Sequence, residues 1–294
     1  MNYSGNFAKI YNHLFNNIPY NETNIECNDN KMLYEILNVQ LTINIPFIDN
    51  VPYVNMYSNA DTRALPIGFT LAEFLTILTP NSNVSHLARF NKNILNYTEF
   101  GNISYHYGTH IWYQLPDVLD LLKTDKNTRQ ACANIWEHGE LFNKHKSCNV
   151  FLQFIIRNDR LNLVVISRSS DFLTGLLIDS FHWQMLLIAF WYDLKNTYGD
   201  LLPGSVIYKI TSLHVYEKDK FVFDDTKWLS YEPEYSHYLS MHSSFTNLFE
   251  IANNVRTCEN VDDLLKLYKF DSSQVQVIEN LRYVYKNRKY NLSR

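Results

Sequence analysis

Two apolar, β-branched runs separated by only two residues constrain the fold of this chain most strongly. The runs "NVFLQFIIR" and "RLNLVVISR" flank the dipeptide Asn158-Asp159, whose residues tolerate positive φ. This pattern predicts a β-hairpin with a primed two-residue turn. Such a turn pairs Arg157 with Arg160, and counting back places Cys148 opposite Ser169, unless a β-bulge shifts the register by one residue.

Polar residues follow the second strand of this hairpin. The segment "RSSDFLTG" comes directly after it, and Asp179 then precedes the apolar run "MLLIAFWY". A carboxylate beside a core segment is costly to desolvate unless another group pairs with it. Asp179 could cap the N-terminus of a helix, or it could serve a site at the end of the strand, and both roles are compatible.

The rest of the chain alternates between strand and helix patterns. "LNVQLTINIP" and "SVIYKITSLHVYEK" are strand-like, whereas "GFTLAEFLTIL" and "LPDVLDLLKT" are helix-like, as is the run near Asp179 to Leu194. This mixture predicts an α/β (α+β) fold. After about residue 220 the pattern changes to aromatic loops and then to helices with scattered basic residues, which predicts a solvated helical tail.

Composition and charge exclude several classes of protein. The 294 residues are 46% hydrophobic with a net charge of −4, and they carry no basic stripe, which argues against direct nucleic-acid binding. The most apolar run, Met185 to Tyr192, falls far short of the ~20 residues that span a bilayer. The chain opens without a secretory signal pattern, and its four cysteines form no Cys-x-x-Cys pair. We therefore expect a cytoplasmic protein (host cytoplasm if viral) with reduced thiols and no metal site.

Cys148 is the candidate nucleophile. A cysteine close to an arginine gains thiolate character, and the hairpin register brings Cys148 near Arg168. The alternative is a small buried hydrophobic residue at a strand end. The polar neighbours in "HKSCN" and the donors of Arg168, Ser169 and Ser170, which suit a phosphate, favour a reactive site.

Five motifs in order resemble the thymidylate synthase family, which includes the phage deoxycytidylate hydroxymethylases. They are "YHYG", "DKNTR", "SCNVFLQFIIR", "RSSDFLTG" and "SLHVY", and the likeness extends from about residue 70 to 220. The resemblance implies a large mixed sheet flanked by helices and a homodimer formed through the sheet. It also implies a catalytic domain over residues 1–235, followed by a helical C-terminal extension over 236–294.

The resemblance also implies roles for individual residues. Cys148 adds to C6 of a pyrimidine nucleotide, Glu73 orders water and relays protons, and Tyr107 helps to remove the C5 proton. The implied substrate-binding residues are Arg168, Ser169, Ser170 and Asp171 near the phosphate, His214 and Tyr216 at the sugar, and Arg129 from the partner subunit. The implied co-substrate is 5,10-methylenetetrahydrofolate, and the residues that bind it are unknown.

Asp179 bears on the choice of base. Thymidylate synthases have Asn at the corresponding position, whereas a carboxylate accepts from the 4-amino group of cytosine and favours a protonated N3. We therefore expect hydroxymethylation of dCMP or CMP. Asn149 and Gln130 stand where the synthases have His and a second Arg, which also favours water over hydride in the last step. The alternatives are a C5-methylase of dCMP or dUMP and a catalytically silent nucleotide-binding homologue.

Overall fold

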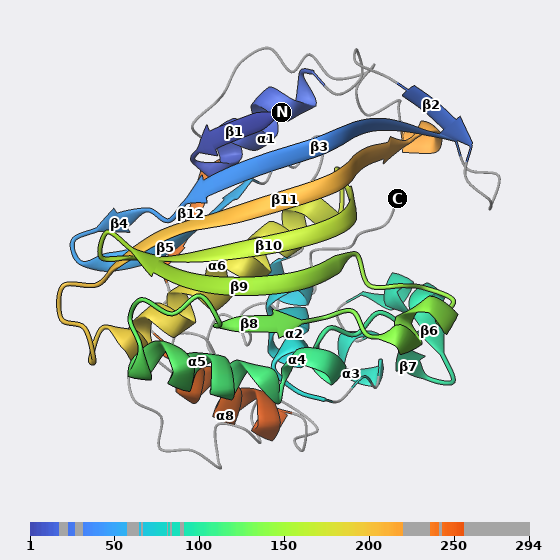
Figure 1. Ribbon diagram of the computed structural model, residues 1–294. Helices are drawn as coiled ribbons and strands as arrows, with labels where there is room; N and C mark the ends of the chain where they lie inside the picture. The colour runs from blue at the N-terminus through green and yellow to red at the C-terminus, as the bar shows by residue number, and fades with distance from the viewer. Residues whose placement is uncertain are drawn as a thin grey trace.

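The computed structural model describes residues 1–17, 23–26, 32–57, 65, 67–80, 82, 84–88, 91–219, 236–240 and 243–255. Within them a seven-stranded mixed sheet forms the centre of the fold, and helices pack against it (Figure 1). The predicted fold class is therefore confirmed. None of the helices in the described ranges is long and apolar enough to cross a membrane.

The central sheet combines parallel and antiparallel strands. The strands lie in the order β1 (Asn2–Gly5), β3 (Met32–Asn44), β11 (Leu202–Tyr216), β10 (Arg160–Asp171), β9 (Asn149–Arg157) and β8 (Cys132–Asn134), and β2 (Thr23–Glu26) pairs with β3. The pairs β1–β3 and β10–β11 are parallel, and the other pairs are antiparallel. Parallel neighbours need a crossover, and α6 (Gly175–Leu194) is the crossover from β10 to β11.

The predicted hairpin is confirmed as β9–β10. The turn dipeptide Asn158-Asp159 has φ values of 50° and 54°, and Arg157 pairs with Arg160. The predicted pairing of Cys148 with Ser169 is wrong by one residue. A register shift between Ile166 and Ser167 intervenes, so the N–H of Arg168 donates to the carbonyl oxygen of Cys148 at 2.9 Å. This irregularity brings Arg168 directly beside the candidate nucleophile.

Helix α6 forms the centre of the core and lies behind the sheet in Figure 1. Apolar side chains surround it on nearly all sides, as expected for a fully buried helix. Its Gln184 side chain accepts from the N–H of Asn55 at 2.9 Å and donates to the Asn55 carbonyl at 3.0 Å. This paired contact joins α6 to β5 (Val51–Tyr57). Gln184 therefore supports the core and not the site.

The remaining elements cover the α6 side of the sheet and its ends. They are α1 (Phe7–Phe15), α2 (Ile67–Ile77), α3 (Ser85–Ala88), α4 (Gly108–Ile111), α5 (Gln114–Thr124), α8 (Phe245–Val255), the strands β4 (Phe47–Ile48) and β12 (Ser236–Ser240), which pair with β5, and the small hairpin β6 (Thr98–Glu99) with β7 (Asn102–Ile103). The helices predicted in "GFTLAEFLTIL" and "LPDVLDLLKT" are α2 and α5.

The start of the predicted C-terminal extension packs on the main core. Strand β12 pairs with β5, and the ring of Phe245 on α8 lies 4.8 Å from that of Phe190 on α6. Asp193, near the end of α6, accepts from the N–H of Thr246 at 3.0 Å. Residues 256–294 of the extension lie outside the described residues.

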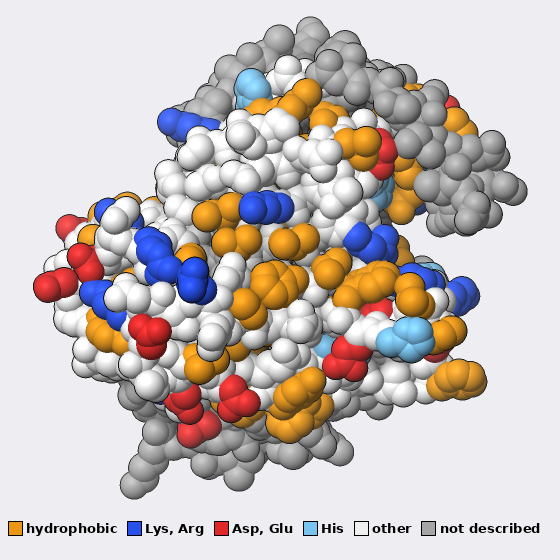
Figure 2. Space-filling model, viewed as in Figure 1, with side chains coloured by type: hydrophobic (Ala, Val, Ile, Leu, Met, Phe, Trp, Pro, Cys, Tyr) orange, Lys and Arg blue, Asp and Glu red, His pale blue; other side chains and the backbone are white. Residues whose placement is uncertain are grey.

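The sheet face opposite α6 carries apolar side chains. Phe154 of β9 stacks on Phe190 of α6 at 4.1 Å, so alternate residues of the same strand point away from the helix. The residues of this open sheet face are Phe151, Ile155, Val164, Ile166 and Ile207, each partly or well exposed. Figure 2 shows hydrophobic side chains spread over this side of the molecule. A face of this kind is typical of an interaction surface.

Candidate active site

The hairpin and the segment before it hold Cys148 by its backbone. Its carbonyl accepts from the Ser167 hydroxyl at 3.0 Å and from the Arg168 N–H at 2.9 Å. The Ser169 hydroxyl lies 3.9 Å from the Cys148 sulfur. Burial raises the pKa of the Cys148 thiol, whereas the Arg168 charge and the Ser169 hydroxyl lower it. The resting group is therefore a thiol whose anion has a cation and a donor nearby.

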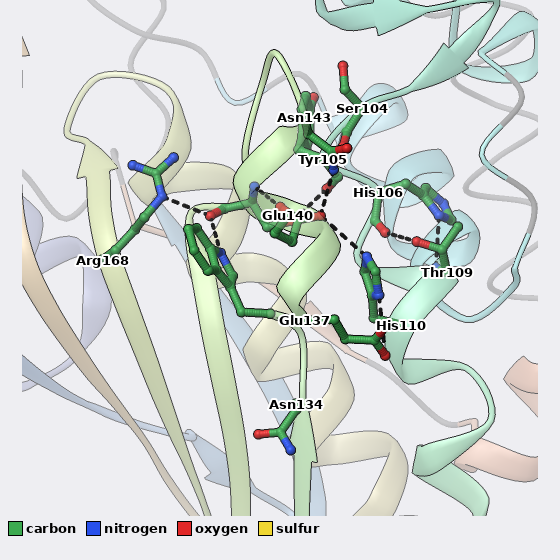
Figure 3. Close-up of polar contacts among 12 residues, drawn as sticks. Ser104, Tyr105, His106, Thr109, His110, Asn134, Glu137, Glu140, Asn143 and Arg168 are labelled. Atoms are coloured by element: carbon green, nitrogen blue, oxygen red, sulfur yellow. Dashed lines mark hydrogen bonds and ion pairs between the residues drawn. The ribbon is translucent and has the colours of Figure 1, made fainter.

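Arg168 supports the segment that ends at Cys148 (Figure 3). Its Nε donates to the Ser147 carbonyl at 3.0 Å, one terminal nitrogen donates to the Lys146 carbonyl at 3.0 Å, and the other donates to the Ser169 hydroxyl at 3.1 Å. Its guanidinium also lies over the ring of Trp136, at 6.0 Å. A guanidinium has five N–H groups, so two remain for an anion.

Glu140 holds the same segment from the other side (Figure 3). This carboxylate is 1% exposed, and its Oε2 accepts from the N–H of Ser147 at 2.8 Å. Its Oε1 accepts from Asn143 at 3.0 Å and lies 3.3 Å from Nε2 of His110. The indole of Trp136 donates to the Ser147 carbonyl at 2.8 Å. Both backbone groups of the residue before the nucleophile are therefore bound.

Asp179 is held in a buried polar network beside Cys148. Nδ2 of Asn149 donates to Asp179 Oδ2 at 2.9 Å and to the Tyr107 hydroxyl at 2.8 Å. The Tyr208 hydroxyl lies 2.9 Å from Asn149 Oδ1 and 3.1 Å from Asp179 Oδ2. Burial raises the pKa of Asp179 to about 6, and hydrogen bonds from Asn149, Tyr208 and Tyr107 limit the rise. The partners that a buried carboxylate requires come from β9, β11 and the residue preceding α4.

Close packing around Gly108, the next residue along the chain, and a ring contact with Trp183 position Tyr107. Its ring stacks on Trp183 of α6, with centroids 5.9 Å apart. A Cβ added to Gly108 would lie 2.1 Å from the carbonyl oxygen of Thr79 and 2.6 Å from that of Thr76. Only glycine fits there, which explains the Tyr-Gly pair in physical terms.

Glu73 is the second carboxyl group of the site. Burial and the negative charge of Asp179 raise the pKa of Glu73 to about 8, and the Tyr105 hydroxyl opposes the rise. Nε2 of His182 lies 3.8 Å from Glu73 Oε2 but only 3.0 Å from the Thr70 carbonyl. Burial lowers the pKa of His182 to about 4, so at neutral pH this imidazole is neutral and donates to Thr70. Glu73 is then mostly protonated, whereas Asp179 is mostly ionised.

Two buried polar groups at the ends of β10 and β11 lack partners. Among the described residues, the Ser170 hydroxyl and Nδ1 of His214 accept and donate no hydrogen bond. His214 pairs with Asp171 across the parallel strands, and its ring lies 5.1 Å from that of Tyr216. Burial lowers the pKa of His214, and the Asp171 charge opposes this. Unpaired buried groups of this kind suit a polar ligand.

Asp171 and Arg129 differ from the other predicted binding residues. The Asp171 carboxylate accepts from the N–H of Leu173 at 2.9 Å and from the Thr174 hydroxyl, so it stabilises the turn into α6. The Arg129 side chain is exposed, and no contact among the described residues joins it to Cys148 within the chain. The structure therefore brings together the other nine predicted residues around β9, β10, β11 and α6, while Asp171 supports them from the turn.

Sequence reasoning missed Glu140, Tyr208 and Glu35. Glu35 accepts from the Ser212 hydroxyl and pairs with His214 across β3 and β11. Glu35 and Tyr208 lie on separate strands from their partners, and Glu140 binds Ser147 in an irregular segment, so hydrophobic periodicity contains no signal for them. Within the described ranges, no group of three or more His, Cys, Asp or Glu side chains could hold a metal ion.

Comparison with known proteins completes this description. The family model described as "Thymidylate synthase" matches residues 9–262. The chain is 33% identical over 174 residues to the deoxyuridylate hydroxymethyltransferase of Bacillus phage SP01, covering 51% of this chain and 44% of the relative. It is 27% identical over 105 residues to the thymidylate synthase of Mycoplasma genitalium, covering 35% of each protein. It is 29% identical over 104 residues to the bifunctional dihydrofolate reductase-thymidylate synthase of Zea mays, covering 35% of this chain and 19% of that protein. Each match spans less than half the length of the relative.

Proposed function

This chain belongs to the thymidylate synthase family, and we propose that it hydroxymethylates C5 of a cytidylate, dCMP or CMP, through a covalent adduct between Cys148 and C6 of the base. The observation that carries this proposal is the buried Asp179 carboxylate beside Cys148, with hydrogen bonds from Asn149 and Tyr208 to its Oδ2. An ionised carboxylate in that position suits a base that presents a donor.

The preference for cytosine follows from hydrogen-bond chemistry. Cytosine presents a 4-amino donor, whereas uracil presents a 4-oxo acceptor that an ionised carboxylate repels. The pKa of about 6 for Asp179 leaves it mostly ionised at neutral pH. The relative from Bacillus phage SP01 is named for deoxyuridylate, so uridylate is the competing substrate and has to be tested beside cytidylate.

The nucleotide would lie across the ends of β10 and β11. We assign the 5′-phosphate to the two free N–H groups of Arg168 and to Ser169, which already contact one another at 3.1 Å. Ser170, with its buried unpaired hydroxyl, lies next along the strand. His214 has an unpaired Nδ1 and, with Tyr216, would receive the sugar hydroxyl.

Different residues of the chain act in different steps of the reaction. Cys148 forms the S–C6 bond and gives up its proton, and the electron pair of the C5–C6 double bond moves so that C5 becomes the nucleophile. After C5 has gained its one-carbon substituent, the C5 proton is removed with the help of Tyr107, and its electron pair expels the carrier amine, which leaves an exocyclic methylene on C5. Water then adds to that carbon and Cys148 leaves, which produces a hydroxymethyl group, whereas a hydride in place of water would produce a methyl group. Glu73, mostly protonated because its pKa is about 8, orders this water and supplies or receives protons near the base.

The family's co-substrate, 5,10-methylenetetrahydrofolate, supplies the one-carbon unit at the oxidation level of formaldehyde. Two partly buried apolar side chains, Tyr105 and Ile178, lie between the two hydrophobic clusters of the protein. Tyr105 also interacts with Glu73, and Ile178 adjoins Asp179 on α6. Because they are apolar, only partly buried and next to Glu73 and Asp179, we assign the ring of the co-substrate to them.

We also propose a homodimer formed through the open sheet face. The exposed apolar residues of β9, β10 and β11 on this face would be buried between two copies. Ile166 is 37% exposed, and Arg168 follows it two residues later, so the nucleotide site lies near this face. In such a dimer the exposed Arg129 would reach the phosphate in the partner's site.

The direct test uses dCMP, CMP and dUMP labelled with tritium at C5, each with and without methylenetetrahydrofolate. We expect folate-dependent release of tritium from a cytidylate and a product that mass spectrometry identifies as the hydroxymethyl nucleotide. Cys148→Ala should abolish the release. Release from dUMP alone would show that the base assignment is wrong, and a methyl product would show that hydride replaces water. Release from none of the three would place the protein among nucleotide-binding homologues without activity.

A further inference from the structure

Asn149 occupies an unusually constrained position between the nucleophile and the base-recognising carboxylate. It is the first residue of β9, directly after Cys148, and its side chain is fully buried. Nδ2 contacts Asp179 and Tyr107, and Oδ1 contacts the Tyr208 hydroxyl. The Asp179 carboxylate can only accept, so its contact with Nδ2 determines which way the amide points, and the single Tyr208 proton is available to Asp179 Oδ2.

The same contacts exhaust the donors of the amide. A carboxamide nitrogen has two protons, and here one is directed to Asp179 Oδ2 and the other to the Tyr107 hydroxyl. No proton of Asn149 remains for a substrate. Asn149 therefore acts on a bound base through the groups that its amide protons hold, Asp179 and Tyr107, and of these Asp179 is the base-recognising group, which makes Asn149 a positioning residue.

We propose that Asn149, assisted by Tyr208, determines which pyrimidine this site accepts. The hydrogen bond from Asn149 to Oδ2 holds the Asp179 carboxylate ionised. The ionised carboxylate favours the 4-amino group of cytosine over the 4-oxo group of uracil. This inference rests on the proposed function of the site. It adds the residue that controls the choice of base and the physical means by which it does so.

The reason lies in the two forms of a buried carboxyl group. An ionised carboxylate only accepts, and it therefore suits the amino group of cytosine. A protonated carboxyl can donate to O4 of uracil and accept from its N3–H, and it can also donate to N3 of cytosine and accept from the 4-amino group, so it admits both bases, whereas the ionised form repels O4 of uracil. Burial favours the protonated form, and hydrogen bonds to the oxygens favour the ionised one. The pKa of about 6 for Asp179 lies close below neutrality, so the loss of one donor moves the group toward the form that suits uracil.

Other titratable groups surround Asp179 and shape the same balance. An ionised Glu73 on α2 would disfavour the Asp179 carboxylate, because the two charges repel. The groups that interact with Asp179 from the elements around it are Glu73, Tyr105, Tyr107, Cys148 and Tyr208. His182 lies one helical turn further along α6 and is neutral. Around neutral pH none of these groups changes its charge before Asp179 does, so the transition near pH 6 belongs to Asp179.

The test compares the ratio of kcat/KM for dCMP to kcat/KM for dUMP between pH 5 and pH 8. Asn149→Leu keeps the approximate volume and removes the donor, and Tyr208→Phe removes only a hydroxyl. In the unaltered protein we expect the ratio to rise with pH through about 6. In both variants the ratio at pH 7.5 should fall by about tenfold or more, since a hydrogen bond to a charged group has been removed, and the transition should move to higher pH.

Tyr198→Phe, which removes a hydroxyl that donates to the Leu122 carbonyl far from this network, is the matched control and should leave the ratio unchanged.

The outcomes separate this inference from the proposed function. A ratio and a transition that both remain unchanged in a folded Asn149→Leu or Tyr208→Phe protein would overturn the inference while leaving the function in place. If the unaltered protein turns over neither nucleotide, the proposed function fails, and the same ratio is then measured as calorimetric affinities for dCMP and dUMP. The inference holds if the variants shift that affinity ratio toward dUMP, and it is overturned if they do not. A preference of the unaltered protein for dUMP would overturn both.

Discussion

Glu73 and Asp179 are similar carboxyl groups that their surroundings make chemically different. Both are buried and close enough to interact, yet the pKa of Glu73 is about 8 and that of Asp179 is about 6. Three donors oppose burial at Asp179, namely Asn149, Tyr208 and Tyr107, whereas Tyr105 alone does so at Glu73. A pair of titratable groups whose pKa values are separated in this way is typical of an acid and a base with distinct roles.

This separation predicts the pH dependence of kcat/KM for dCMP. Activity should rise with pH through about 6, because an ionised Asp179 accepts more strongly from the 4-amino group than a protonated one does. It should fall above pH 8, because Glu73 loses the proton that it contributes. Glu73→Gln cannot ionise, so its residual activity should lack the fall at high pH. A profile without the rise near pH 6 would show that the ionisation of Asp179 plays no part in catalysis.

Arg168 should control the reactivity of the Cys148 thiol. Its positive charge lowers the pKa of that thiol against the effect of burial. Arg168→Gln should therefore slow alkylation of Cys148 by iodoacetamide at pH 8, by roughly tenfold for each unit by which the pKa rises. Peptide mass mapping distinguishes residue 148 from Cys132, the other free thiol in the described ranges. Arg160→Gln, at the opposite end of β10, is the control, and equal rates in both variants would contradict the assignment.

At the scale of elements, the segment from His138 to Cys148 has no regular structure beyond one 3-10 turn, His138–Phe142. Its position is instead determined at Ser147, whose N–H donates to Glu140 and whose carbonyl accepts from Trp136 and Arg168. These contacts connect the segment to β10 through Arg168 and to α4 through His110 and Glu140. Hydrogen bonds at Ser147, and not a helix or a strand, therefore position the residue before the nucleophile.

Removal of the Glu140 carboxylate should loosen this segment. Glu140→Ala leaves the buried N–H of Ser147 without its partner, which should cost about 1–3 kcal/mol of unfolding free energy. It should also lower kcat, since Cys148 is the next residue. Glu137→Ala is the matched control, because Glu137 directly precedes the same segment but its side chain is 51% exposed, and it should change stability by less than about 0.5 kcal/mol. Urea denaturation and single-turnover rates measure both effects, and equal stability of the two variants would contradict the proposed role of Glu140.

The approach of α4 to the residues that follow α2 should be equally sensitive. Gly108→Ala would place a Cβ 2.1 Å from the carbonyl oxygen of Thr79, so the backbone has to move. We expect a loss of about 1–3 kcal/mol or more in unfolding free energy, as for an overpacked core. Gly139→Ala meets no atom within 4 Å and should be nearly neutral. Thermal unfolding of both proteins checks this, and a neutral Gly108→Ala would mean that the contact with Thr79 relaxes freely.

At the scale of the whole molecule, the two faces of the sheet have different uses. One face packs on α6 and forms the core, whereas the open sheet face carries Ile166 and its apolar neighbours (Figure 2). Arg168 stands on β10 beside that open face, and Cys148 lies opposite it across the hairpin. A second copy on this face would therefore lie next to the phosphate end of the site.

Mixing of two inactive variants tests whether Arg129 acts across such an interface. Cys148→Ala lacks the nucleophile, and Arg129→Ala lacks the proposed trans contact. After equal amounts have been mixed and allowed to exchange subunits, we expect recovery of about one quarter of the activity, because half of the dimers are mixed and each mixed dimer has one intact site. No recovery, in samples shown by light scattering to be dimeric, would mean that Arg129 acts within its own chain or not at the site.

Local sequence was sufficient to place the hairpin and the buried helix, although it missed the register shift at the end of the hairpin. The turn residues Asn158-Asp159 determine the hairpin, and the apolar run of α6 determines a buried helix. Together they place Cys148 near Arg168, because a hairpin aligns its two ends. The family resemblance added the other candidate residues, Glu73, Tyr107, Arg129, His214 and Tyr216, and it supplied the roles.

Features that depend on distant residues required the tertiary structure. Asn149 and Asp179 lie 30 positions apart, Gln184 and Asn55 lie 129 apart, and β12 pairs with β5 across the length of the chain. The register shift beside Ile166 and the contact between Glu140 and Ser147 are equally invisible in a pattern of apolar residues. Hydrophobic periodicity records which side of an element is buried, but the partner of a buried polar group depends on how the elements pack. The sequence therefore indicated that Asp179 needed a partner, and only packing decided that Asn149 and Tyr208 would be that partner.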